Sequence, residues 1–318
     1  MSKGLKFFFI AFFVSFLGIF ALNIFQENLE NYFYAQISQP LQNMAEVKIP
    51  EKPDLELQAK AAISVRVNEV GKAKILFKKN INQPLPIASL TKLMTALVVL
   101  ENPKDYDFSK SITISEDAAN QENVPNYGNL KGGQKLSLEE LLDLILIYSS
   151  NDAAYALAEE MKVENFAPVV EQSSLRGFVE KMNQKAKDLG LENTYFVNPT
   201  GLDPEKLHYN PEALNYFNHS TARDLVKLAQ YILKEHPLIF EISRKEPFYL
   251  IKDGIFDLFL TQEVVGGKTG YTDEAGGCIL FLFRNERRSI FINLILGAPS
   301  SSARITEMQK LINYQARL

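Results

Sequence analysis

The sequence predicts an α/β fold of the α+β type, in which a mainly antiparallel sheet is flanked by helices and carries an inserted helical lobe. Residues 61–67 and 73–79 alternate in strand fashion around a turn-like segment, which predicts an early hairpin. Strand-like apolar runs return only after residue 254, and helical spacing dominates between residues 89 and 250. We therefore expect a sheet lobe from residues 60–88 and 255–318, and a helical lobe from residues 89–254.

The first 25 residues have the pattern of a membrane span. Lys3 and Lys6 precede about 19 mostly apolar residues, which is long enough to cross a bilayer as a helix. Lysines before the span predict a cytoplasmic N-terminus, with all that follows on the extracytoplasmic side of the cell membrane. A cleaved signal peptide and a buried core helix are the alternatives, although no small-residue cleavage site follows the span. Residues 26–59, with three prolines, are interpreted as a linker or stalk.

The remaining elements follow from local patterns in chain order. Helices are expected at residues 89–100, 136–146, 152–161, 178–189, 221–234 and 300–317. A turn is expected at 198–201, and strands at 264–271, 278–283 and 289–296. Both ends of the chain thus supply strands, and the middle supplies helices.

Composition excludes several classes of function. The net charge of −4 and the lack of any basic run give no reason to expect nucleic acid as a partner. A single cysteine, Cys278, cannot form an internal disulfide and is expected to be a small buried side chain. The three histidines are scattered, so we expect neither a metal site nor a cofactor that depends on one.

The segment from Pro86 to Leu100 carries the first chemical motif. Pro84 and Pro86 interrupt any preceding element, and an apolar helical run begins at Ser89. Ser89 and Lys92 are three residues apart and share one helix face. A serine hydroxyl becomes a nucleophile when a base removes its proton, and a lysine amine kept neutral by burial is such a base. The alternative is an N-cap serine beside a lysine whose stem packs on the core.

Two later motifs supply groups that would complete such a site. Ser149-Ser150-Asn151 lies between helical segments; Ser149 can pass a proton to a leaving amine, and Asn151 can hold Lys92 and a substrate amide. Taken alone, this motif is an ordinary helix cap.

Lys268-Thr269-Gly270 ends an apolar run and is, taken alone, an ordinary strand-to-turn sequence. Lys268 can offer a fixed cation to a substrate carboxylate, and Thr269 adds a hydroxyl to it. Gly270 lets substrate approach the strand edge. The backbone N–H groups of Ser89 and Tyr271 are the candidates for an oxyanion hole.

The three motifs, in this order, resemble those of the serine-type D-alanyl-D-alanine carboxypeptidases, the low-molecular-mass penicillin-binding proteins. The resemblance extends over residues 61–299 and is carried by segments 87–96, 149–154, 198–202, 220–225 and 267–276. It implies the β-lactamase/DD-peptidase-like penicilloyl-serine transferase fold over residues 60–318. It also implies a peptidoglycan stem peptide ending in D-Ala-D-Ala as substrate, an acyl-enzyme on Ser89, and covalent inhibition by β-lactams.

Some features differ from the family pattern and leave alternatives open. Members often carry a C-terminal β-domain and an amphipathic anchoring helix, and we expect the N-terminal span to replace that anchor. Residues 259–263 lack the usual asparagine-containing approach to the third motif. The alternatives are a DD-endopeptidase of the same fold, a β-lactamase, and an inactive peptidoglycan-binding protein. Residues 212–215 come one residue short of a β-lactamase-like ExxLN pattern, a near-match that we attribute to chance.

Overall fold

A computed structural model describes residues 55–106, 109–121, 129–161, 173–204, 217–245 and 263–316. All of them belong to one compact unit, residues 45–318. The predicted span at 1–25 and nearly all of the predicted linker at 26–59 lie outside the described residues. Within the described ranges, every helix is too short or too polar to cross a bilayer.

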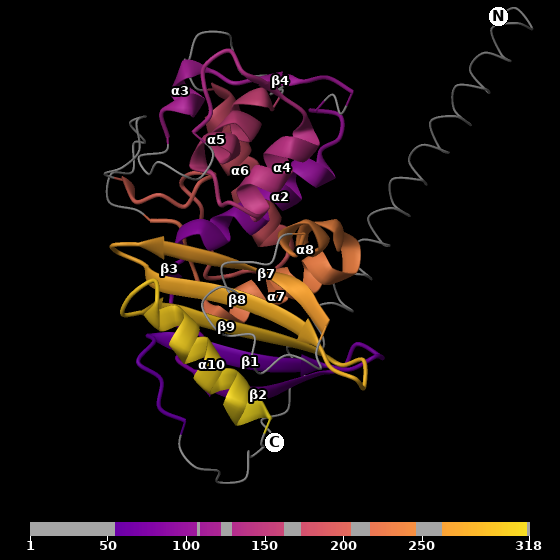
Figure 1. Cartoon of the computed structure of the whole chain (residues 1–318), viewed down its shortest axis with the longest axis vertical. Coiled ribbons are helices and arrows are strands. Elements are labelled where there is room, and N and C mark those ends of the chain that lie inside the picture. Colours follow the sequence, from indigo (N-terminus) through magenta and orange to yellow (C-terminus); the bar gives the residue numbers. More distant parts are fainter. Residues whose placement is uncertain are drawn as a thin grey trace, which may run out of the picture. The chain divides into compact units, whose positions relative to one another are not determined.

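The sheet is antiparallel, as the sequence predicts, and both ends of the chain build it (Figure 1). Its strands are β1 (Ala61–Val67), β2 (Ala73–Lys79), β7 (Glu263–Thr272), β8 (Gly276–Arg284) and β9 (Ile290–Ala298), in the order β2-β1-β9-β8-β7. The N-terminal hairpin joins the C-terminal strands where β1 pairs with β9, with Ala61 opposite Leu296. The chain thus reaches the third motif, on edge strand β7, only after the helical segments.

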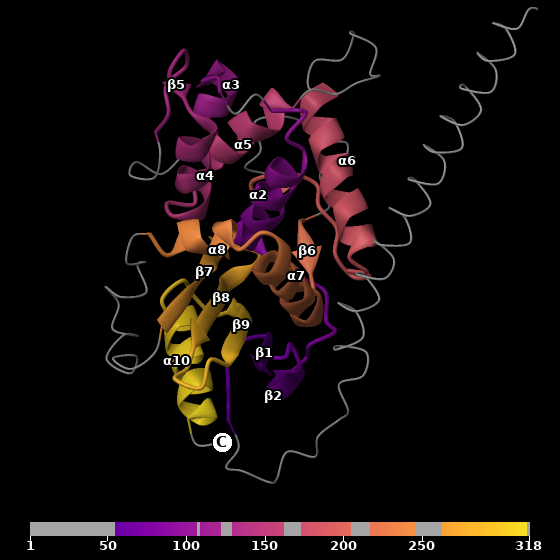
Figure 2. The same ribbon diagram turned by 90° about the vertical axis from the view of Figure 1, so that its right-hand side faces the viewer.

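Helices cover both faces of this sheet (Figure 2). Helix α10 (Ala303–Gln315) packs Met308 and Leu311 against Phe281 and Ile295 on one face. Helices α7 (Ala222–Glu235) and α8 (Leu238–Ser243) lie on the other face. Their sequence falls within the range assigned above to the helical lobe, yet their apolar faces pack on the sheet.

The helical lobe surrounds α2 (Lys92–Glu101), which is buried along nearly its whole length. Around it lie α4 (Leu138–Leu146), α5 (Asn151–Glu160) and α6 (Ser173–Asp188), with the short α3 (Glu116–Ala119) against α5. Helix α4 begins later than expected because Ser137 and Glu140 form a reciprocal capping box at its start. Leu136 instead belongs to β5 (Lys135–Leu136), which pairs with β4 (Ile112–Thr113).

A second short ladder fixes the chain just before Ser89. Strand β3 (Leu85–Pro86) pairs with β6 (His219–Ser220), and the Ile87 N–H donates to the Asn218 carbonyl at 3.1 Å. The first motif is therefore fixed by this ladder on one side and continues on the other into α2, the central helix of the helical lobe.

Candidate active site

Ser89 lies in a tight turn that precedes the helix, not at the helix start that the sequence suggests. Residues Ala88–Thr91 form the 3-10 turn η1, and α2 begins at Lys92. Neither element has a side-chain cap, so the Ser89 hydroxyl is not an N-cap. Ala88 is buried with a φ of +47°, a backbone region that alanine adopts at a cost. This strained turn holds Ser89 so that its hydroxyl faces Lys92.

The Lys92 amine is fully buried among three neutral oxygens. Its Nζ lies 2.9 Å from Ser89 Oγ, 2.7 Å from Asn151 Oδ1 and 2.6 Å from the Thr200 carbonyl oxygen. A neutral amine can donate two N–H bonds, to Asn151 and Thr200, and then accept the Ser89 hydroxyl proton with its lone pair. The geometry therefore suits a base that takes a proton from Ser89.

The Thr200 carbonyl is a site group that the sequence predicted only as part of a turn. The Asn198 side chain organises this turn, because its Oδ1 accepts from the backbone N–H groups of Thr200 at 3.1 Å and Gly201 at 2.7 Å. Asn198 Nδ2 also donates to the Leu202 carbonyl at 3.1 Å. The local signal for this turn is the run Asn198-Pro199-Thr200-Gly201, but nothing local relates it to Lys92.

In the second motif, structural and chemical roles fall on different residues. Ser150 caps α5 by accepting from the Ala153 N–H at 3.1 Å, so the cap interpretation holds for this serine. Ser149, with a φ of +63°, is freed from capping, and its Oγ accepts from Lys268 Nζ at 2.8 Å. Asn151 opens α5 and contacts Lys92 as expected.

Lys268 brings a second buried amine to the site from strand β7. It is 1% exposed, and its Nζ also donates to the Thr269 carbonyl at 3.1 Å. Burial first, and then the positive charges of Lys92, when its amine is protonated, and of Arg304 hold the pKa of Lys268 well below its usual value. Burial thus disfavours a cation at Lys268, and an anion placed beside the amine would favour its charged form.

Arg304, at the start of α10, is a further group near the site that the sequence did not single out. Its Nη1 donates to the Gly270 carbonyl at 2.8 Å, across 34 residues of chain. Arg304 therefore fixes the strand edge just beyond Lys268 and adds positive charge to this region.

Gly270 is required by the approach of β7 to the nucleophile turn. A Cβ on Gly270 would lie 2.9 Å from the Ser89 backbone nitrogen and 3.1 Å from the Ala88 Cβ. The sequence explained this glycine by substrate approach alone, and the structure adds a contact within the protein. The neighbouring Tyr271 side chain is 46% exposed, and Thr269 is half-buried.

The structure thus connects the predicted residues into one constellation. Ser89, Lys92 and Asn151 share hydrogen bonds, Ser149 and Lys268 share another, and Gly270 brings β7 against Ser89. Together they place one hydroxyl beside a buried amine, and a second hydroxyl beside a second buried amine. This set of groups is suited to acyl transfer through a covalent intermediate.

Comparison with protein families gives an independent result. The family described as D-alanyl-D-alanine carboxypeptidase matches residues 46–300. The chain is 32% identical over 272 residues to D-alanyl-D-alanine carboxypeptidase DacF of Bacillus subtilis, covering 82% of this chain and 63% of that protein. It is 33% identical over 249 residues to a D-alanyl-D-alanine endopeptidase of Pseudomonas aeruginosa, covering 73% of this chain and 70% of that protein. The chain therefore spans less than two thirds of the first relative's length.

Solved structures share the fold. The peptidoglycan synthesis regulatory factor PBP3 of Streptococcus pneumoniae aligns with a TM-score of 0.69 at 28% identity, over 82% of this chain and 72% of that one. Penicillin-binding protein D2 of Listeria monocytogenes, in its cefotaxime-bound form, aligns with a TM-score of 0.63 at 27% identity, over 83% of this chain and 99% of that one. These matches confirm the fold that the sequence resemblance implied.

Proposed function

We propose, since the chain belongs to the D-alanyl-D-alanine carboxypeptidase family, that it removes the terminal D-Ala from peptidoglycan stem peptides. The observation that carries the proposal is the 2.9 Å contact between Ser89 Oγ and the buried Lys92 Nζ, beside Ser149 and Lys268. A peptide ending in D-Ala-D-Ala presents both a carbonyl for Ser89 and a free carboxylate for Lys268. The site needs no metal or cofactor for this reaction.

Acylation follows from these positions. Ser89 Oγ attacks the carbonyl carbon of the penultimate D-Ala as its proton moves to Lys92. The developing oxyanion accepts hydrogen bonds from the backbone N–H groups of Ser89 and Tyr271. The C–N bond then breaks, and Ser149 passes a proton to the leaving amine of the terminal D-Ala. Water next attacks the ester on Ser89 and releases the shortened stem.

Lys268 recognises the free carboxylate in this scheme, with Thr269 adding its hydroxyl. Because burial disfavours a lone cation at Lys268, the arriving carboxylate supplies the missing counter-charge and raises its pKa. Replacing Lys268 by alanine should weaken turnover of a free-carboxylate stem by roughly one to two orders of magnitude. An amidated stem cleaved by the wild type at an equal rate would contradict this role.

Release of D-alanine from a defined muropeptide tests the reaction. The full chain should release free D-alanine from a pentapeptide stem, and prior treatment with a penicillin should block this release. A fluorescent penicillin should label the wild type, while Ser89→Ala and Lys92→Ala should not be labelled. Labelling of Lys92→Ala at the wild-type rate would refute the assignment of Lys92 as the base. Absence of labelling in a folded wild-type chain would favour an inactive peptidoglycan-binding protein.

Two related activities stay open. Relatives named D-alanyl-D-alanine endopeptidase match this chain at 33% identity in Pseudomonas aeruginosa and 30% in Escherichia coli, which favours testing crosslink cleavage. Crosslinked and uncrosslinked muropeptides, compared at equal concentration, separate the two. A β-lactamase would instead turn penicillin over rapidly, whereas the proposed enzyme should form a long-lived acyl-enzyme. The cefotaxime-bound and ampicillin-bound forms of the Listeria neighbour support β-lactams as ligands.

We also propose that the N-terminal span anchors the chain in the cell membrane with the catalytic domain outside. The apolar segment after Lys3 and Lys6 supports this proposal. Extraction of the full chain by detergent, but not by high salt, is the expected result, and release by salt alone would contradict it.

A further inference from the structure

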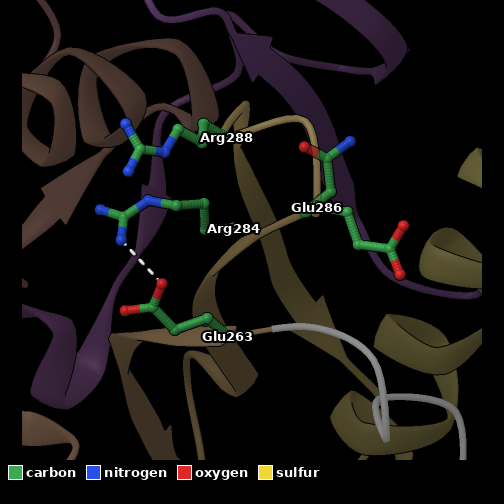
Figure 3. Close-up of a pocket in the computed structure, with 5 residues that line it drawn as sticks. Glu263, Arg284, Glu286 and Arg288 are labelled. Carbon is green, nitrogen blue, oxygen red and sulfur yellow. Dashed lines mark hydrogen bonds and ion pairs between the residues drawn. The ribbon is translucent and has the colours of Figure 1, made fainter.

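The sheet end remote from Ser89 carries a polar hollow of about 500 Å³ (Figure 3). It is lined by Glu263, where β7 begins, by Arg284, where β8 ends, and by Asn285, Glu286 and Arg288 of the turn that follows. Glu263 stands opposite Arg284 in the β7–β8 ladder. Roughly 15 Å of extended strand separates Glu263 from Lys268, so this hollow is distinct from the site described above.

Two arginines and two glutamates line the hollow, and Arg244 beside Glu263 adds a third guanidinium group. The Glu263 carboxylate forms ion pairs with Arg284 at 2.8 Å and with Arg244 at 3.4 Å, so that one anion is shared by two guanidinium groups. Figure 3 shows the side chains of Arg284 and Arg288 pointing in the same direction, whereas the Glu286 carboxylate points away from both. Within the described part of the chain, no carboxylate lies within ion-pair distance of Arg288. The local excess contrasts with the net charge of −4 of the whole chain.

The turn that carries Arg288 is held by its own hydrogen bonds. The Asn285 N–H donates to the Ser289 carbonyl at 3.1 Å, the Ser289 N–H donates to Asn285 Oδ1 at 2.9 Å, and the Arg288 N–H donates to the Asn285 carbonyl at 2.9 Å. Arg288 has a φ of +56°, which glycine or asparagine would adopt at lower cost. The chain therefore keeps a long cationic side chain at a backbone position that does not favour one.

We propose that this hollow binds the phosphate group of a phosphate ester, between the guanidinium groups of Arg284 and Arg288. Adjacent guanidinium groups offer several N–H donors to phosphate oxygens, in the geometry that suits paired bonds. A phosphate carries more negative charge than a carboxylate and better balances the excess beside Glu263. The same chemistry is offered by a soluble phosphate ester and by an anionic phospholipid headgroup.

Calorimetric titration of the full chain in detergent with glycerol 3-phosphate tests the proposal. Arg288→Gln removes the charge and keeps much of the side-chain length, and we expect it to weaken binding about tenfold or more. Arg287→Gln is the matched control, because Arg287 is an exposed arginine of the same turn that does not line the hollow; we expect less than a twofold change. Equal thermal unfolding midpoints would show that both variants are folded.

The outcomes separate a built site from diffuse attraction. Equal weakening of glycerol 3-phosphate binding in both variants would overturn the proposal, since any charge on this surface would then suffice. The proposal would also be overturned if the wild type bound neither glycerol 3-phosphate nor the phospholipid used in the experiment below. For the lipid source, the full chain is placed in phosphatidylcholine nanodiscs with or without phosphatidylglycerol. Slower hydrogen exchange at residues 285–289 with phosphatidylglycerol, lost in Arg288→Gln, would identify a headgroup as the ligand. An unchanged exchange together with glycerol 3-phosphate binding would identify a soluble ester.

Discussion

Gly201 should control acylation without contacting substrate. It has a φ of +85°, and a Cβ placed on it would lie 2.1 Å from the Ala88 carbonyl oxygen and 3.0 Å from the Ser89 backbone nitrogen. It also follows Thr200, whose carbonyl accepts from Lys92 at 2.6 Å. Gly201→Ala must therefore push apart two segments that each position a reacting group.

The magnitude follows from the size of this overlap. Restoring an ordinary contact to the Ala88 oxygen requires the segments to move apart by about 1 Å, and a misplacement of about 1 Å can lower a reaction rate by about 10²-fold. Overpacking costs about 1–3 kcal/mol, and the left-handed backbone of alanine adds about 1–2 kcal/mol. We expect Gly201→Ala to lose about 2–5 kcal/mol of unfolding free energy and about 10²-fold in acylation rate.

Gly190 provides a matched control. Its φ of +63° is also left-handed, but a Cβ there would meet nothing within 4 Å. Gly190→Ala should lose only the unfolding free energy that left-handed backbone costs an alanine, about 1–2 kcal/mol, and should keep the wild-type acylation rate. The assay is the second-order rate of labelling by a fluorescent penicillin, with urea unfolding to define conditions in which each variant is folded.

One result would refute the reasoning about Gly201. If folded Gly201→Ala is labelled as fast as Gly190→Ala, the close approach of this turn to Ala88 and Ser89 does not position the reacting groups. Equal losses of acylation rate in both variants would also contradict this reasoning, because the two variants share only the cost of placing alanine in a left-handed backbone conformation.

Two further predictions concern buried charge. Lys268→Met should raise the free energy of unfolding near neutral pH, because it removes a buried amine whose pKa is lowered in the folded chain. Between that folded-state pKa and the ordinary lysine pKa, the unfolded chain binds more protons than the folded chain. The stability of the wild type therefore rises with pH in that window. Urea unfolding at several pH values should show the advantage of Lys268→Met shrinking as the pH approaches 10, and a constant difference would contradict it. Burial by itself raises the pKa of Glu101, but hydrogen bonds from His236, Lys185 and Tyr231 together lower it below its usual 4.5. Glu101→Gln should therefore lower the free energy of unfolding by about 1–3 kcal/mol at pH 7. This difference should vanish as the pH falls through the folded-state pKa of Glu101, below 4.5. A difference that persists in acid would show that packing, and not the charge of Glu101, is responsible.

The groups proposed to react could be predicted because their signals are local. Ser89 and Lys92 lie one turn apart before an apolar run, and Lys268 follows a strand-like run. The strand bounds 61–67 and 73–79 match β1 and β2, since alternation and a turn define a hairpin without distant contacts. The start of α2 was misplaced because a 3-10 turn and an α-helix show nearly the same apolar spacing over four residues.

By itself, the sequence determined the candidate reacting residues, the hairpin and the antiparallel, helix-flanked class of fold. Only the tertiary structure decided which neutral oxygens surround Lys92, that Arg304 fixes Gly270, and that α7 and α8 cover the sheet. The Thr200 carbonyl reaches Lys92 across 108 residues, and a backbone oxygen is the same in every residue type. A contact of this kind has no side-chain pattern, because it depends on where the folded chain places the backbone.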